Sequence, residues 1–130
     1  MKNIATIGRI LFALPFGIIG LNHFFMTDTF LGMMSSFLPG GGYTIMLTGV
    51  FLIAASILII LNKFIKIVCF SVAGLLFLFI VTIHIPHLFS ADSAIIQEGL
   101  FGLLKDTGLM GGALIISAYY NPEDEAKASE

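Results

Sequence analysis

Four apolar runs, each long enough to cross a lipid bilayer, occupy nearly all of this 130-residue chain. They span residues 4–25, 43–61, 65–89 and 95–120. A helix rises 1.5 Å per residue, so about 20 residues cross the roughly 30 Å of hydrocarbon. Strands of membrane barrels are about ten residues long and alternate in polarity, unlike these runs. We therefore predict an all-α fold, a four-transmembrane-helix antiparallel bundle over residues 1–120, followed by a polar cytoplasmic tail, 121–130.

The composition supports a lipid environment. Apolar residues make up 58% of the chain and charged residues 11%, against about 45–50% and 25% in an average soluble domain. This chain therefore lacks the charge to cover a water-facing surface, and we expect the lipid bilayer to be its main partner. With six Lys and Arg in total, there is no basic patch to indicate nucleic-acid binding. A lone cysteine, Cys69, excludes a disulfide within the chain.

The connections between the runs are short. The second, 62–64, is so brief that the second and third spans must pack as antiparallel neighbours. The first, 26–42, ends in the triplet Gly40-Gly41-Gly42. Glycine continues a helix poorly, so we interpret this connection as a helix break and an outer loop.

Cationic residues mark one side of the membrane. Outside the fourth run they lie near the two chain ends and at the second turn, as Lys2, Arg9, Lys63, Lys66 and Lys127. The first and third connections carry only acidic residues. By the positive-inside rule, we predict a multi-pass protein of the bacterial inner (plasma) membrane with both termini cytoplasmic. Arg9 lies about 7 Å into the first span, close enough to serve as a cytoplasmic-side anchor.

Polar residues from three of the runs fall near the opposite, extracytoplasmic side. Helix rise places them about 21–32 Å above the cytoplasmic end; they are Asn22, His23, His84, His87, Lys105 and Asp106. Ionisable side chains inside a span are costly and by default indicate a functional site facing the bundle interior. We therefore predict that these six residues form a ligand-binding or proton-relay site. A purely structural polar clasp is the alternative.

Pro86 lies between two of these histidines, in His84-Ile85-Pro86-His87. Proline has no amide hydrogen and removes the helical bond to the carbonyl of Thr82. We therefore predict that the outer end of the third span is kinked or frayed, which would open the mouth of the bundle.

Glycines provide small surfaces for helix packing. The first run contains Gly17 and Gly20, and the fourth contains Gly108, Gly111 and Gly112. Small residues spaced by four let helix backbones approach each other closely. We predict that these surfaces pack the first span against the fourth, with a dimer seam as the alternative.

Together these residues resemble the DoxX family of small four-helix membrane proteins. The resemblance rests on Arg9 followed by the glycine-rich stretch 15–23, on the Gly49 region, and most specifically on 104–114. It implies a four-helix membrane fold and polar residues at Arg9, His23, Lys105 and Asp106. It also implies a link to redox chemistry, since some members resemble membrane subunits of redox systems, including thiosulfate:quinone oxidoreductase and complexes that guard against oxidative stress.

The leading functional hypothesis is an accessory or small-molecule-binding subunit of a membrane redox system, with a quinone as the possible cofactor. The polar site would hold the quinone head, and Asp106 with His84 or His23 would relay protons. The apolar spans would hold its tail. The chain carries no separate domain with a redox motif, so whether it catalyses a reaction by itself stays open.

Two alternatives remain. His23 and His84 lie at similar heights on different spans, as two haem ligands would, and Met26, Met33 and Met34 would suit copper. We assign no metal ligands, because methionine in an apolar protein usually fills space. The second alternative is a non-enzymatic assembly or partner-binding role, through a membrane protein partner or a homo-oligomer.

Overall fold

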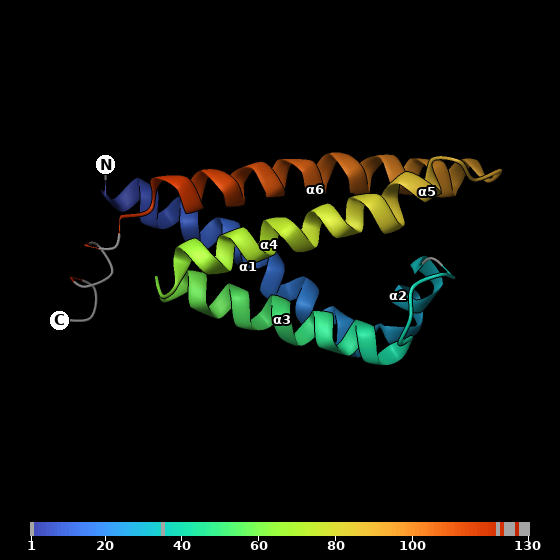
Figure 1. Cartoon of the computed structure of the whole chain (residues 1–130), viewed down its shortest axis with the longest axis horizontal. Helices are drawn as coiled ribbons and strands as arrows, with labels where there is room; N and C mark the ends of the chain where they lie inside the picture. Colours follow the sequence, from blue (N-terminus) through green and yellow to red (C-terminus); the bar gives the residue numbers. More distant parts are fainter. Residues whose placement is uncertain (1, 35, 122, 124–126, 128–130) are drawn as a thin grey trace.

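The computed structural model describes residues 2–34, 36–121, 123 and 127. Within these residues there is no strand, and four helices are long and apolar enough to cross a membrane: Asn3–Phe25, Gly42–Ile60, Ile65–His87 and Ser93–Tyr119. They run side by side along the long axis of the molecule (Figure 1). The prediction of an all-α fold with four spans is confirmed, and the chain is a multi-pass membrane protein. Much of the predicted polar tail, 122, 124–126 and 128–130, lies outside the described residues.

The helices in chain order are α1 (Lys2–Phe25), α2 (Thr27–Met33), α3 (Gly42–Ile60), α4 (Ile65–Phe79), the π-helical turn η1 (Ile80–His84), α5 (Ile85–His87) and α6 (Ser93–Tyr119). The elements α4, η1 and α5 together form the third span. The four spans begin and end within about two residues of the predicted bounds.

The first connection differs from the sequence prediction, because it contains the short helix α2. The chain bends at Met26, and the Phe30 amide then donates to the Met26 carbonyl at 3.2 Å as the helix resumes. Asp28 lies in the first turn of α2, where a negative charge is favourable to the helix dipole. The predicted break comes later, at Gly40 and Gly41, whose φ angles are +93° and +51°. Such angles suit glycine.

The bundle consists of two closely packed helix pairs, α1 with α3 and α4 with α6. Figure 1 shows α6 lying along α4, and the later half of α1 lying along α3. Side chains from both pairs form one apolar core, which includes Phe16, Leu52, Ile59, Val72 and Ala113. The short turn between α3 and α4 makes these two helices antiparallel neighbours, as the sequence predicted.

Glycines let α1 and α3 cross with their backbones nearly in contact. A Cβ added to Gly20 would lie 2.9 Å from the Gly49 carbonyl oxygen, and a Cβ added to Gly49 would lie 2.9 Å from the Gly20 carbonyl oxygen. A Cβ added to Gly17 would likewise lie 2.9 Å from the hydroxyl oxygen of Ser56 on α3. The Ser56 hydroxyl donates to the Ala13 carbonyl at 2.8 Å and so ties the two helices together.

The predicted glycine-mediated packing of the first span against the fourth is therefore wrong for α1, whose Gly17 and Gly20 face α3. On α6, a Cβ added to Gly108 or Gly111 would contact nothing within 4 Å. Of these three α6 glycines only Gly112 faces α1, because a Cβ added to it would lie 3.1 Å from the Phe12 ring. Small residues indicate that a helix can be approached closely, but they do not identify the approaching helix.

Pro86 is accommodated by a π-helical turn rather than a frayed end. Over Ile80–His84 the helix widens, and the Ile85 amide donates to the Ile80 carbonyl, five residues back. The helix then continues through Pro86 to His87. Single π-helical turns in α-helices are rare and occur frequently at functional sites.

Arg9 joins α1 to the end of α3. Its Nη1 donates to the carbonyl of Ile59 and, at 3.0 Å, to that of Ile60. These carbonyls belong to the last turn of α3, where a positive charge is favourable. Arg9 is thus an anchor near the predicted cytoplasmic end, attached to a helix terminus of the protein itself.

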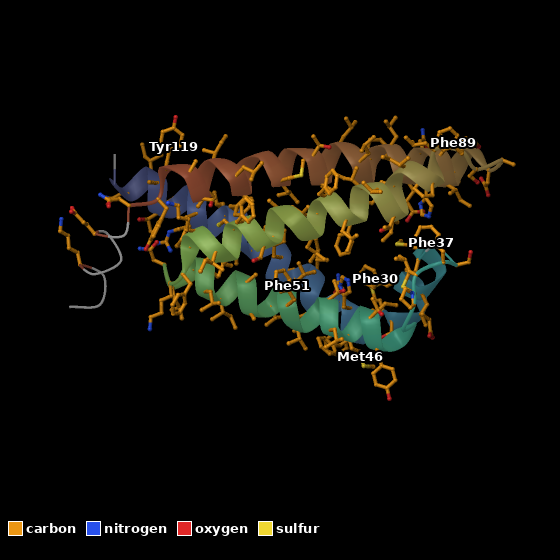
Figure 2. The ribbon with its side chains drawn as sticks, in the orientation of Figure 1. Phe30, Phe37, Met46, Phe51, Phe89 and Tyr119 are labelled. Atoms are coloured by element: carbon orange, nitrogen blue, oxygen red, sulfur yellow. The ribbon has the colours of Figure 1, made fainter. Side chains whose placement is uncertain are left out.

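Large aromatic side chains project outward near both ends of the bundle. Phe37 and Phe89 lie at the α2 end and Tyr119 at the opposite end (Figure 2). Phe89 is 85% exposed and Tyr119 is 86% exposed. Aromatic residues favour the two membrane–water interfaces, so their placement agrees with helices that span a bilayer.

Candidate functional site

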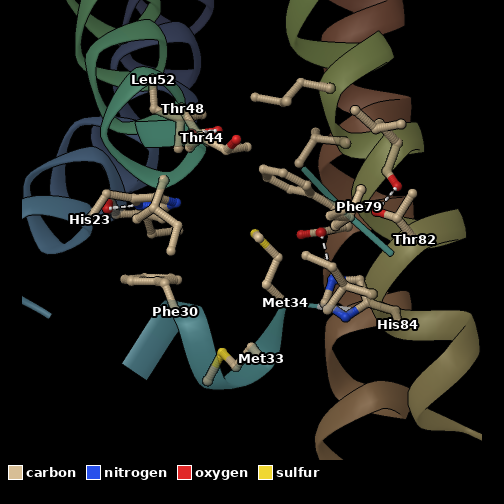
Figure 3. A pocket seen from close by; sticks show the side chains of 18 of the residues that line it. His23, Phe30, Met33, Met34, Thr44, Thr48, Leu52, Phe79, Thr82 and His84 are labelled. Atoms are coloured by element: carbon tan, nitrogen blue, oxygen red, sulfur yellow. Dashed lines mark hydrogen bonds and ion pairs between the residues drawn. The ribbon is translucent and has the colours of Figure 1, made fainter. Parts of the chain in front are cut away.

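A cavity of about 210 Å³ lies between the two helix pairs, toward the end where α2 lies. All four spans contribute to it, with α2 and the segment after α2 closing one side. Figure 3 shows its two facing walls. Its apolar lining includes Phe16, Ile19, Leu52, Leu75, Leu76 and Phe79. Its polar lining consists of His23, Thr44, Thr48, Thr82, His84, Lys105 and Asp106.

Asp106 is the centre of the polar wall formed by η1 and α6. It is 2% exposed. Its Oδ2 lies 2.8 Å from His84 Nε2, and its Oδ1 lies 3.3 Å from Lys105 Nζ. A carboxylate buried in an apolar bundle is stable only when it is paired and hydrogen-bonded. Each oxygen of the Asp106 carboxylate has such a partner, His84 for Oδ2 and Lys105 for Oδ1.

Two glycines of α6 make room for the histidines of the third span. A Cβ added to Gly102 would lie 2.2–2.9 Å from three ring atoms of His84. A Cβ added to Gly99 would lie 2.6 Å from the His87 Cβ. Gly102 thus lets the His84 ring pack directly against α6, within reach of Asp106 one turn further on.

His23 occupies the opposite wall. It is 5% exposed, and its Nδ1 lies 2.7 Å from the Ile19 carbonyl oxygen. Its ring stacks on Phe30 of α2 with a centroid distance of 4.0 Å and an interplanar angle of 19°. Figure 3 shows His23 and Phe30 on one side, facing His84 across the cavity, with Met34 between the walls.

The structure brings together four of the six predicted site residues. His23, His84, Lys105 and Asp106 line the cavity. Asn22 is half-buried on α1 and does not line the cavity. His87 also lies outside the lining. It packs on Gly99, and its buried Nδ1 has no hydrogen-bond partner among the described residues.

Several lining residues were not predicted. The threonines Thr44 and Thr48 are spaced by four residues in an apolar run, which puts them on one helix face. That spacing was a usable signal. Phe30 and Met33 were missed as lining residues because α2 was not predicted.

The pairing of His84 with Asp106 bears on the haem alternative. Within the described part of the chain, no group of three or more His, Cys, Asp or Glu side chains gathers where it could hold a metal ion. His84 directs Nε2 to Asp106 rather than into the cavity. Haem ligation by His23 and His84 together would therefore require breaking that bond.

Comparisons with protein-family models, with curated proteins and with solved structures found no match to this chain. An apolar space with a few convergent polar groups suits a small apolar ligand with a polar head. The aromatic rings of His23 and Phe79 at the cavity surface suit a planar head group.

Proposed function

We propose that this chain is a DoxX-like membrane protein that binds a small quinone-like molecule and serves as an accessory subunit of a membrane redox system. The single observation that supports the proposal most strongly is the cavity itself. It combines apolar walls with the buried Asp106 carboxylate, which is paired with His84 and with the more exposed Lys105. Ionisable side chains at this depth in a membrane span by default indicate a functional site.

A quinone head would fit between the two polar walls. His23 would contact it from α1, and the His84–Asp106 pair would contact it from the third and fourth spans. The start of an isoprenoid tail would lie against Leu52, Leu75 and similar side chains deeper in the bundle. When bound, a quinone supplies two-electron, two-proton redox chemistry that the side chains lack.

The orientation belongs to the same proposal. Lys63 and Lys66 lie at the turn between α3 and α4, and Arg9 lies at the same end. The cavity and α2 lie at the other end, where the connections carry acidic residues. With the cationic end cytoplasmic, the cavity opens near the extracytoplasmic side of a bacterial inner membrane.

Ligand-induced stabilisation tests the proposal. The full chain is purified in detergent, and its thermal midpoint is measured with short-chain benzoquinones in the oxidised and reduced forms. At about one hundred times Kd, a bound ligand adds about 2.7 kcal/mol to the free energy of unfolding. We expect a higher midpoint with at least one form, and a weaker effect in Asp106→Asn.

The control variant is Asn22→Ala, since Asn22 lies on α1 beside His23 but outside the cavity. It should respond to the ligand like the unchanged protein. If neither redox form raises the midpoint at any tested concentration, the proposed function is wrong.

A further inference from the structure

The threonine hydroxyls at the cavity use their hydrogens elsewhere. Thr44 Oγ1 donates to the Pro39 carbonyl at 2.6 Å, and Thr48 Oγ1 donates to the Thr44 carbonyl at 2.8 Å. Figure 3 shows both threonines beside Leu52 on the wall that also carries His23. A hydroxyl has one hydrogen and two acceptor lone pairs. These side chains therefore present only lone pairs to a ligand.

His23 also presents an acceptor. A carbonyl oxygen can only accept, so the 2.7 Å contact with Ile19 places the imidazole hydrogen on Nδ1. No described carboxylate forms an ion pair with His23, and an unpaired charge at this buried position would be costly. In the neutral ring, Nε2 is then an acceptor. It belongs to the ring edge that faces the cavity in Figure 3.

The facing wall has the same character. Whichever of His84 Nε2 and Asp106 Oδ2 carries the shared hydrogen, that hydrogen lies between them and not in the cavity. The second ring nitrogen of His84, Nδ1, lies against Gly102 of α6, so a hydrogen on it would point to that helix. The remaining lone pairs of the Asp106 carboxylate can only accept. Lys105 is the donor among these lining groups. Its ammonium is paired with Asp106 Oδ1, and its side chain is 54% exposed.

We infer that the polar surface of this cavity is built from hydrogen-bond acceptors and selects a ligand that donates. This inference rests on the proposed function, and it means that the site binds the dihydroxy form, the quinol, in preference to the quinone. The two hydroxyls of a quinol donate to His23 Nε2 and to the Asp106–His84 wall. A quinone offers only carbonyl oxygens, which would face the lone pairs of His23, Thr44, Thr48 and Asp106 and lose their hydration without gaining a hydrogen bond from these groups.

Direct binding measurements separate the two redox forms. The full chain in detergent is titrated with a short-chain benzoquinol under reducing conditions, with the matching quinone, and with the quinol dimethyl ether. We expect the quinol to bind at least about tenfold more tightly than the quinone, since each unmatched buried acceptor costs about 1–3 kcal/mol. A tenfold preference raises the midpoint potential of the bound couple by about 30 mV. The dimethyl ether, which cannot donate, should bind like the quinone.

Variants identify the acceptors. His23→Phe keeps an aromatic ring against Phe30 but removes Nε2, so quinol affinity should fall about tenfold while quinone affinity stays the same. Thr48→Val is isosteric and milder than His23→Phe. It should also reduce the affinity for quinol while leaving the affinity for quinone unchanged. Asn22→Ala is the matched control on α1 and should change neither affinity.

The outcomes are distinct. Equal affinity for quinol and quinone, or equal loss of both in His23→Phe, overturns this inference and leaves the proposed function standing. Binding of neither form overturns both.

Discussion

At the scale of single residues, the Asp106 carboxylate is stabilised by two partners inside an apolar bundle, His84 and Lys105. Replacing His84 with Leu leaves one buried carboxylate oxygen without its hydrogen bond. We expect His84→Leu to lower the free energy of unfolding by about 1–3 kcal/mol. Denaturant titration of the purified protein in mixed micelles, followed by circular dichroism, measures the change.

The double variant is the control for this prediction. In His84→Leu/Asp106→Leu no buried charge is left, and a well-packed apolar pair can be as stable as a buried ion pair. The double variant should therefore be less destabilised than His84→Leu alone. If the free energy of unfolding of the double variant falls by the sum of the losses in His84→Leu and Asp106→Leu, the pairing of the two side chains is not the source of the effect.

Gly102 is the second residue whose replacement has a definite expected outcome. A Cβ there would lie 2.2–2.9 Å from three His84 ring atoms, so Gly102→Ala must displace the ring from Asp106. We expect a loss of about 1–3 kcal/mol, as for overpacking elsewhere in protein cores. Gly108→Ala on the same helix is the matched control. Its Cβ meets nothing within 4 Å, and alanine favours helix by about 1 kcal/mol over glycine. Equal effects of the two changes on stability would contradict the packing described here.

The sequence predicts the depth of a side chain in the membrane better than the direction in which it points. Helix rise correctly brought His23, His84, Lys105 and Asp106 to one end of the bundle. Adjacent residues on a helix point about 100° apart, and of the neighbours Asn22 and His23 only His23 lines the cavity. The π-helical turn before His87 adds a further rotation that no residue pattern indicated.

At the scale of elements, α2 is the part of the site most open to a separate test. Phe30 supports the His23 ring and lines the cavity, whereas Leu31 is 38% exposed on the same helix and does not line the cavity. We expect Phe30→Ala to weaken quinol binding by about two- to tenfold, because a stacked aromatic pair contributes about 0.5–1.5 kcal/mol beyond its buried area. Leu31→Ala should leave binding unchanged. Isothermal titration with the quinol compares them, and equal affinities for the two variants would argue against a role for α2 in the site.

The spans were predictable because hydrocarbon thickness sets their length, and their bounds agree closely with the sequence prediction. The helix α2 was not predictable in the same way. It has seven residues and no side-chain cap, so it lacks the length and the end signals by which helices are recognised. The pairing of α1 with α3 was also beyond the sequence, since Gly20 and Gly49 meet only in the folded bundle.

At the scale of the whole molecule, the proposed orientation makes the two ends of the bundle chemically distinguishable. Ala91 lies exposed in the connection between the third and fourth spans, and Lys63 lies exposed in the turn between α3 and α4. In a Cys69→Ala background, a membrane-impermeant maleimide applied to spheroplasts should label Ala91→Cys and not Lys63→Cys. Permeabilisation should make both reactive. If only Lys63→Cys is labelled before permeabilisation, the orientation is opposite to the proposed one.

In the proposed function, the cavity between the two helix pairs binds a quinone-type ligand. The most direct measurement is photo-crosslinking of the full chain with a short-chain azidoquinone, followed by peptide mass spectrometry. We expect the label on cavity-lining segments, 44–52 of α3 and 105–109 of α6, and its loss when unlabelled quinol competes. Label that is spread over lipid-facing residues such as Phe70 and Phe77 and resists competition would contradict the claim.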